Sequence, residues 1–142
     1  MKIIVRKHKW AVGFLSAAVV LLLFGLSFEK RPFAGMEAED VVSAEMFVIP
    51  PEVTMPLEDA TVITELVDTL KSLKVYGRNN SGRDYVGQLV RFTLTLRDGT
   101  VMSIGEYNPF IYINDICYKA EYGACQRLNA LGNRLLHGQQ VQ

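Results

Sequence analysis

Histidine is scarce in this sequence, with two residues in 142, His8 and His137. His8 lies in a basic stretch near the amino terminus, and His137 lies at the end of the last predicted helix. A Ser-His-Asp or Cys-His arrangement needs an imidazole that the fold holds in place, and neither position offers one. No group of His, Cys or carboxylate residues has the spacing of a metal site. We therefore expect no enzyme, no cofactor and no metal.

Cysteine is equally rare, and its two residues are Cys117 and Cys125. In an exported domain, one Cys on the last predicted strand and one at the start of the following helix could reach the Cα separation of about 5.5 Å that a disulfide needs. Two buried thiols are the alternative, because free Cys is commonly buried, and a redox or metal role is a third. Mass spectrometry with and without reductant separates these interpretations.

Charge is missing from the nineteen residues between Trp10 and Phe28. Spanning a membrane takes about 20 helical residues, whereas the apolar part of a cleaved signal peptide has about 7 to 15. No Cys follows the run, which excludes lipoprotein processing. We expect a basic cytoplasmic tail over 1–9 and an uncleaved transmembrane helix over 10–28. A cleaved signal peptide and a buried soluble helix are the alternatives.

The cations of the chain are segregated. The first 28 residues hold four Lys and Arg and no acid, which leaves eleven Lys and Arg against fifteen Asp and Glu, a net charge of −4, for the rest. Positive residues beside a transmembrane segment tend to stay in the cytoplasm. We therefore expect a single-pass protein of the cell membrane with its amino terminus inside, its body outside, and lipid around residues 10–28. An acidic exported body also argues against nucleic acid as a partner.

Large apolar residues are few between residues 29 and 43, where Glu37, Glu39 and Asp40 occur. A segment of this composition buries little surface, so we expect a flexible tether over 29–43. Residues 44–138 suffice for one core and not for two. They are expected to form the extracytoplasmic domain, and 139–142 a disordered tail.

The pattern of the body predicts an α+β domain. The expected order is β-α-β-β-β-β-α, with an antiparallel sheet of about five strands packed by two helices. Met46 to Ile49 is predicted as an edge strand, because Pro50-Pro51 stops it. Apolar residues at helical spacing predict one helix from about Glu58 to Leu73 and another from about Ala124 to Leu136.

The first predicted hairpin begins with an alternation of apolar and polar residues over 90–97. A three-residue loop, Arg97-Asp98-Gly99 with Gly99 in the left-handed region, pairs Leu94 with Met102 and Phe92 with Ile104. A two-residue loop would leave the side chains of Met102 and Ile104 on the polar face. We therefore expect the bulged hairpin.

The second predicted hairpin turns at Asn114-Asp115, two residues that tolerate positive φ. A two-residue loop pairs Ile113 with Ile116 and Tyr112 with Cys117. The Asp-Gly turn, the Ile111-Tyr112-Ile113-Asn114 stretch that leads to Tyr118-Lys119, and the Leu-rich last helix together resemble small extracytoplasmic domains that Gram-positive Firmicutes carry behind one amino-terminal anchor. The resemblance covers about Glu45 to Leu136 and implies the topology, with no activity attached. Such domains often have Gly after the Asn of the second turn, where this chain has Asp115.

Aromatic and basic residues supply the candidate partner surface. It consists of Tyr107, Phe110 and Tyr112 beside the second hairpin and of Arg78, Arg83 and Tyr85 on a loop over 77–87. Exposed together, these residues would suit a protein, peptide or glycan partner. The alternative is that Phe110 fills the core and the tyrosines cover its rim.

Two functions follow from these interpretations. The first is a binding or sensory-accessory module, which predicts a continuous exposed aromatic or basic patch. The alternative is a structural or envelope-associated protein without a specific ligand, which predicts an evenly polar surface.

Overall fold

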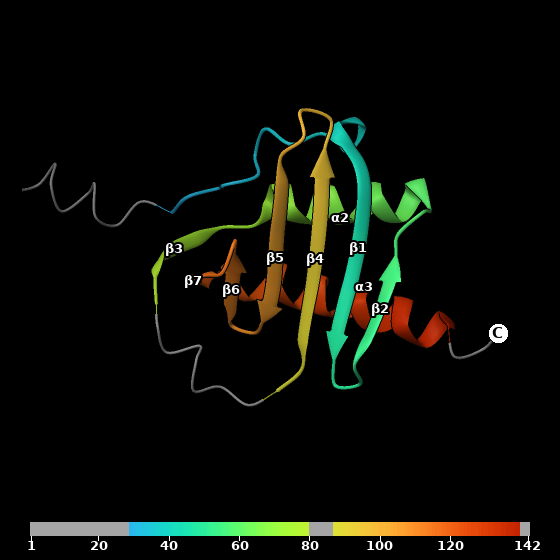
Figure 1. Cartoon of the computed structure of the whole chain (residues 1–142). Helices are drawn as coiled ribbons and strands as arrows, with labels where there is room; N and C mark the ends of the chain where they lie inside the picture. Colours follow the sequence, from blue (N-terminus) through green and yellow to red (C-terminus); the bar gives the residue numbers. More distant parts are fainter. Residues whose placement is uncertain (1–28, 80–86, 140–142) are drawn as a thin grey trace, which may run out of the picture.

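The computed structural model describes residues 29–79 and 87–139. The strands in these residues are β1 (Val41–Ile49), β2 (Val53–Pro56), β3 (Val75–Arg78), β4 (Leu89–Leu96), β5 (Val101–Tyr107), β6 (Phe110–Ile113) and β7 (Ile116–Ala120). They form one antiparallel sheet in the order β2-β1-β4-β5-β6-β7-β3 (Figure 1). The helices are α2 (Ala60–Ser72), α3 (Tyr122–Gln139) and the short 3₁₀ helix η1 (Ala38–Asp40).

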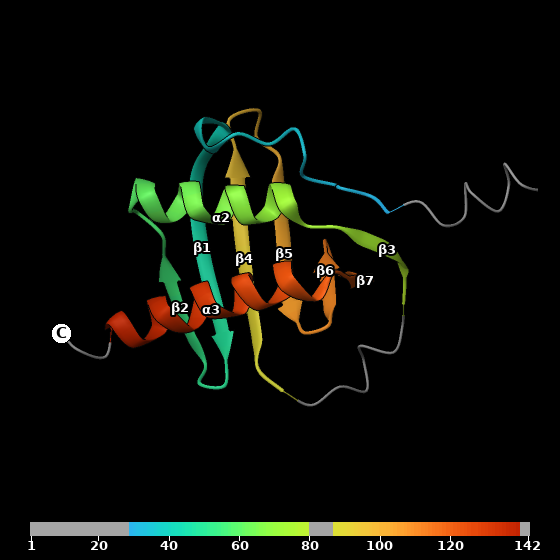
Figure 2. The same cartoon turned by 180° about the vertical axis from the view of Figure 1, so that it is seen from behind.

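Both α-helices cover the same face of the sheet and run across its strands, as Figure 2 shows from the helix side. Helix α2 begins after Asp59, whose carboxylate accepts a hydrogen bond from the Thr61 N–H at 2.8 Å and so caps the helix. Its residues Leu66 and Leu70 are completely buried. The other face of the sheet, which is turned towards the viewer in Figure 1, carries no helix of the described residues.

The hydrophobic core lies between the sheet and the two helices. Side chains alternate between the faces of a strand, and Val90, Phe92 and Leu94 of β4 all point to the helix side, where they are completely buried. Leu128 and Leu131 of α3 meet them from the other layer. The alternation predicted for residues 90–97 is therefore the core-forming alternation of β4.

Both predicted hairpins are confirmed. Leu94 pairs with Met102 and Phe92 with Ile104, and Gly99 has a φ of 87°, as the bulged turn requires. In the second hairpin, Ile113 pairs with Ile116. Its turn residues Asn114 and Asp115 have φ values of 48° and 66°.

The predicted sheet of about five strands is wrong, because the structure has seven. The missing strands are β2 and β3, which have four residues each and show little alternation of their own. β1 is also not the expected edge strand, since β2 pairs along one side of it and β4 along the other. Pro50-Pro51 turns the chain from β1 into β2 and does not end the sheet.

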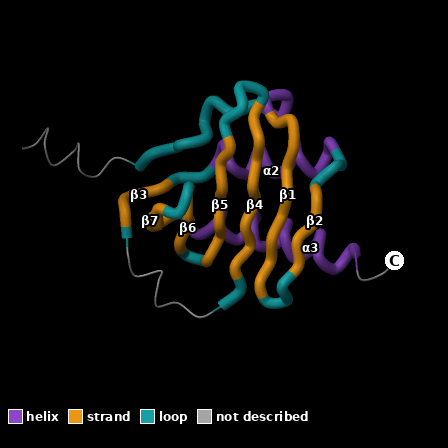
Figure 3. The backbone as a smooth tube through the Cα atoms, in the orientation of Figure 1, coloured by secondary structure: helices purple, strands orange, loops and turns teal. Residues whose placement is uncertain are grey.

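The structure also differs from the predicted tether over 29–43. Phe33 and Met36 are buried in the core, and β1 already begins at Val41. Lys30 and Val75 exchange two backbone hydrogen bonds of 2.8 Å, which tie the segment to β3. Figure 3 shows the segment as a loop that runs to the end of the sheet where β4 turns into β5. Buried apolar side chains and backbone hydrogen bonds thus fix a segment that is rich in acids.

The predicted transmembrane helix is not found among the described residues. In residues 29–79 and 87–139, no helix combines the length and the apolar character needed to cross a membrane. The predicted anchor over 10–28 and basic tail over 1–9 lie outside the described residues, as do residues 140–142 of the predicted tail. Gln139, the first residue of that predicted tail, is the last residue of α3.

Candidate functional site

The face of the sheet without helices has an apolar half and a polar half. One row across it contains Phe47, Arg91, Gly105, Tyr112 and Cys117, which are paired in this order from β1 to β7. In the next row, towards the start of β4, the pairs are Ile49 with Leu89 and Tyr107 with Phe110. We call Phe47, Ile49, Leu89, Tyr107, Phe110 and Tyr112 the open-face patch.

Serine and threonine dominate the rest of this face. Thr93 pairs with Ser103, and Thr95 lies between Ser43 and Val101. The large side chains are therefore gathered at one end of the face and are not scattered over it. Within the patch, Ile49 is 40% exposed, Phe110 is only 7% exposed, and Phe47, Leu89 and the two tyrosines are half-buried.

Because Gly105 has no side chain, three neighbouring side chains occupy the space above it in the middle of the patch. A Cβ atom at this position would lie 3.3 Å from Leu89 Cδ1, 3.5 Å from Tyr112 Cβ and 3.8 Å from Arg91 Nε. The Arg91 side chain therefore lies on the sheet beside Leu89 and Tyr112. This arrangement places a cation among apolar and aromatic groups.

The cations of this face lie in its apolar half. Lys119 pairs with Phe110 in the outer row, and Arg91 pairs with Phe47. Neither cation takes part in any of the ion pairs between described residues. Glu45, by contrast, pairs with Thr93 in the polar half.

The predicted partner surface is brought together only in part. Tyr107, Phe110 and Tyr112 lie side by side on the open-face patch. Arg78 pairs with Tyr118, whose side chain packs against the core, so the register places Arg78 on the opposite face of the sheet. Arg83 and Tyr85 lie outside the described residues.

A second feature is a buried polar network between β5 and α3. Glu106 is completely buried, and its carboxylate accepts hydrogen bonds from the Asn108 N–H at 2.6 Å and from Asn129 Nδ2 at 3.1 Å. Asn133 Nδ2 continues the network to Asn129 Oδ1 and to Gln88 Oε1. Burial raises the pKa of Glu106, and the hydrogen bonds from Asn129 and Asn108 oppose this rise.

The network offers no nucleophile. Burial, with a smaller contribution from the Glu106 charge, raises the pKa of the nearby Cys125 thiol to about 12, so the reactive thiolate is absent at neutral pH. The position of Glu106, two residues after Ile104 on β5, is the signal that places it on the core side of the strand.

Cys117 and Cys125 are both buried free thiols. Cys117 lies on the face of the sheet without helices, because it pairs with Tyr112. Cys125 belongs to α3, on the other side of the sheet, and packs in the core. The structure thus separates the two cysteines that the disulfide interpretation would join.

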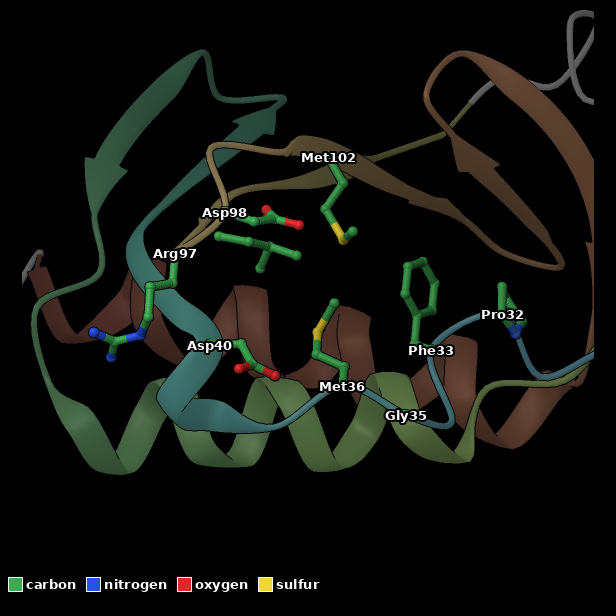
Figure 4. Close-up of a pocket in the computed structure, with 9 residues that line it drawn as sticks. Pro32, Phe33, Gly35, Met36, Asp40, Arg97, Asp98 and Met102 are labelled. Atoms are coloured by element: carbon green, nitrogen blue, oxygen red, sulfur yellow. The ribbon is translucent and has the colours of Figure 1, made fainter.

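A cavity of about 610 Å³ lies where the segment before β1 passes the β4–β5 turn. Phe33 and Met36 line it from the segment, and Met102 lines it from β5 (Figure 4). Asp40 and Asp98 add carboxylates to the lining. The sequence alone did not indicate this cavity, because its two walls come from a predicted tether and a predicted turn.

A groove of about 700 Å³ between α2 and α3 has a different character. Three of its charged groups are already engaged across the helices, since Arg127 Nη2 donates to Ser72 Oγ and Arg134 pairs with Glu65. In the part of the chain that the structure describes, no three His, Cys, Asp or Glu residues come together as a metal site would require.

Comparisons with known proteins find no matching family model, no matching curated protein and no matching solved structure.

Proposed function

We propose that this domain is a binding module that works on the outer side of the cell membrane and docks an acidic segment of a partner protein on its open-face patch. The observation that carries the proposal is the division of the sheet face that carries no helix of the described residues. One half holds the aromatic side chains and most of the aliphatic ones, and the other holds serine and threonine with Glu45 and the exposed Val101. An exposed apolar patch with a polar rim is typical of an interaction surface.

The charges support an acidic partner segment. Arg91 and Lys119 lie in the apolar half of the face, whereas Glu45 lies in the polar half. Arg91 is flanked by Leu89 and Tyr112 over Gly105, so a carboxylate bound to it would be partly shielded from water. Arginine and tyrosine are also the residues that most often dominate binding energy at protein interfaces.

The alternative is an envelope-associated protein without a ligand, and it fits the described surface less well. Such a protein has no need for large apolar residues on a sheet face, and polar residues there would limit aggregation. The polar half of this same face follows that rule, with Thr93, Thr95 and Ser103. The apolar half departs from it.

The location outside the membrane is proposed from the sequence of residues 1–28. An uncharged run of nineteen residues follows a basic stretch, and this charge asymmetry favours export of the body. Protease added to intact cells should digest the domain, and membranes washed at high pH should retain the uncut chain. A chain that is protected in intact cells, or released by the wash, would contradict the proposed location.

Photocrosslinking on the patch tests the proposed docking. Benzoylphenylalanine placed at position 47, in the full chain in its own cells, should give an adduct with one partner protein. Arg91→Glu should abolish the adduct, because it places a negative charge where the acidic segment binds, whereas Arg91→Lys should keep most of it.

The matched control uses the polar half of the same face. Benzoylphenylalanine at position 95 should give no adduct, and Thr95→Glu should leave the adduct at position 47 unchanged. Thermal unfolding of each variant verifies that the domain remains folded. Absence of an adduct at position 47, or adducts of equal yield at both positions, would exclude the patch as a docking site.

A further inference from the structure

The cavity beside the β4–β5 turn has an apolar wall that the fold holds in place. Phe33 and Met36 are 5% and 8% exposed, so these side chains are packed and not free to collapse into the space. Met102 closes the cavity from the side of the sheet (Figure 4). The volume of about 610 Å³ lies within the range of small-molecule sites.

Two carboxylates on the cavity are held in fixed positions. Asp98 Oδ1 accepts a hydrogen bond from the Thr100 N–H at 2.9 Å, and this bond lowers the pKa of Asp98. Asp40 Oδ2 accepts one from the Glu37 N–H at 3.2 Å. Each hydrogen bond engages one oxygen of its carboxylate.

The cation that lines the cavity does not neutralise these acids. Arg97 Nη2 donates to the Glu39 carbonyl at 2.8 Å, and Figure 4 shows its guanidinium turned away from the two methionines. No ion pair between described residues involves Asp40 or Asp98. The cavity therefore combines an apolar wall with two carboxylates that form no ion pair among the described residues, although Arg97 also lines it.

We propose that this cavity is a binding site for a small organic cation with an aromatic or aliphatic body, such as a primary amine. The body would pack against Met36 and Met102, whose flexible side chains adapt to irregular shapes. The ammonium would lie near the carboxylates of Asp40 and Asp98, which line the same cavity as the two methionines.

Such a ligand would contact two parts of the chain that are distant in the sequence. Phe33, Met36 and Asp40 come from the segment before β1, whereas Asp98 and Met102 come from the first hairpin. Binding would stabilise the attachment of that segment to the domain. The site is separate from the open-face patch and does not depend on the proposed docking.

Methyl-labelled methionine gives a direct test by NMR on the folded full chain. Titration with phenethylammonium should shift the methyl signals of Met36 and Met102 in a saturable way. Met46 and Met55 are core residues, 0% and 4% exposed, and serve as internal controls whose signals should not move. Phenethyl alcohol has a body of similar size without the charge, and it should bind more weakly by about three- to tenfold, as expected for two exposed charge contacts.

Variants test the carboxylates. Asp40→Asn combined with Asp98→Asn should weaken the binding of phenethylammonium by the same roughly three- to tenfold factor. Asp68→Asn, at an exposed position of α2, should leave this binding unchanged. Absence of saturable shifts at Met36 and Met102 would overturn the site. Equal affinity for the alcohol and the amine would overturn its preference for cations, and this comparison needs no variant to fold.

Discussion

At the scale of single residues, Glu106 is the one carboxylate that the fold buries completely among the described residues. Its two oxygens accept from the Asn108 N–H and from Asn129 Nδ2, so the ionised form is satisfied by hydrogen bonds. Burial nevertheless penalises the charge, and its net effect is a raised pKa. Burial and the two hydrogen bonds thus shift the pKa of Glu106 in opposite directions. The pH dependence of stability measures the net shift.

The raised pKa of Glu106 predicts a loss of stability as pH rises. The folded protein holds this proton more tightly than the unfolded chain does, whose carboxyl pKa is near 4.5. The contribution to the free energy of unfolding is therefore complete below that value and is lost as pH rises through the folded pKa. Urea denaturation across about pH 4 to 8 measures this slope. Glu106→Gln should remove the contribution of residue 106 to it.

In Glu106→Gln, the side-chain NH₂ group also faces one of the two N–H donors that bind the carboxylate. This contact lowers the free energy of unfolding by a roughly constant amount at every pH. The slope, and not the absolute stability, is therefore the informative quantity. Glu52→Gln, in the exposed turn between β1 and β2, should keep the slope of the wild type. A wild-type slope in Glu106→Gln would show that Glu106 has the same pKa in both states.

At the scale of elements, α3 approaches the sheet closely at Gly132. A Cβ atom there would lie 2.5 Å from Val90 Cγ1 and 3.1 Å from Cγ2. Val90 is completely buried and β-branched, so its side chain has little freedom to move away. The helix accepts a glycine in its interior because the sheet leaves no room for a side chain.

Gly132→Ala should therefore destabilise the domain, although alanine favours helices. Overpacking costs about 1 to 3 kcal/mol, and the gain in helix propensity returns about 1 kcal/mol. Because a Cβ would meet the stiff Val90 side chain at 2.5 Å, we expect a cost at the upper end of that range and a net loss of about 2 kcal/mol. Urea denaturation measures it. Gly138→Ala in the same helix, where a Cβ meets no atom within 4 Å, should cause no loss. Equal stability of the two variants would contradict the close contact.

The elements that local sequence predicted are those whose pattern is complete within the element. β4 shows the alternation of a half-buried strand, and Asp98-Gly99 and Asn114-Asp115 define their turns, so the pairing within both hairpins could be read from the sequence. β2 and β3 are four-residue strands, and what makes them strands is pairing with β1 and β7. Local pattern does not contain that information.

In the candidate site, too, local sequence predicted some neighbours and not those that depend on strand pairing. Tyr107, Phe110 and Tyr112 were grouped from their closeness in the sequence, and the structure places them together. Phe47 and Leu89 join them only because β1 lies beside β4, which no local pattern indicates. Arg78 was grouped with the aromatic residues as part of a loop, but it belongs to β3 and lies on the other face.

At the scale of the whole molecule, the domain includes the segment that precedes β1. Glu29 and Glu37 of this segment form ion pairs with Lys74 at 3.3 Å and with Lys71 at 3.0 Å. The Arg97 N–H donates to the Asp40 carbonyl at 2.7 Å. The acids that suggested a spacer are thus partly engaged with cations near the end of α2, while Phe33 enters the core.

Removal of this segment should therefore cost much of the stability of the domain. Phe33 and Met36 are both buried, and loss of buried side chains of this size costs about 2 to 5 kcal/mol each, against a total of about 5 to 15 kcal/mol for a typical domain. We expect a chain that begins at residue 41, the first residue of β1, to unfold at much lower urea concentration than one that begins at residue 29. Phe33→Ala alone should cost about 3 kcal/mol, and Arg31→Ala, at an exposed position, almost nothing. If the two chains unfolded at the same urea concentration, residues 29–40 would be a tether after all, and the cavity that Phe33 and Met36 line would have no stable wall.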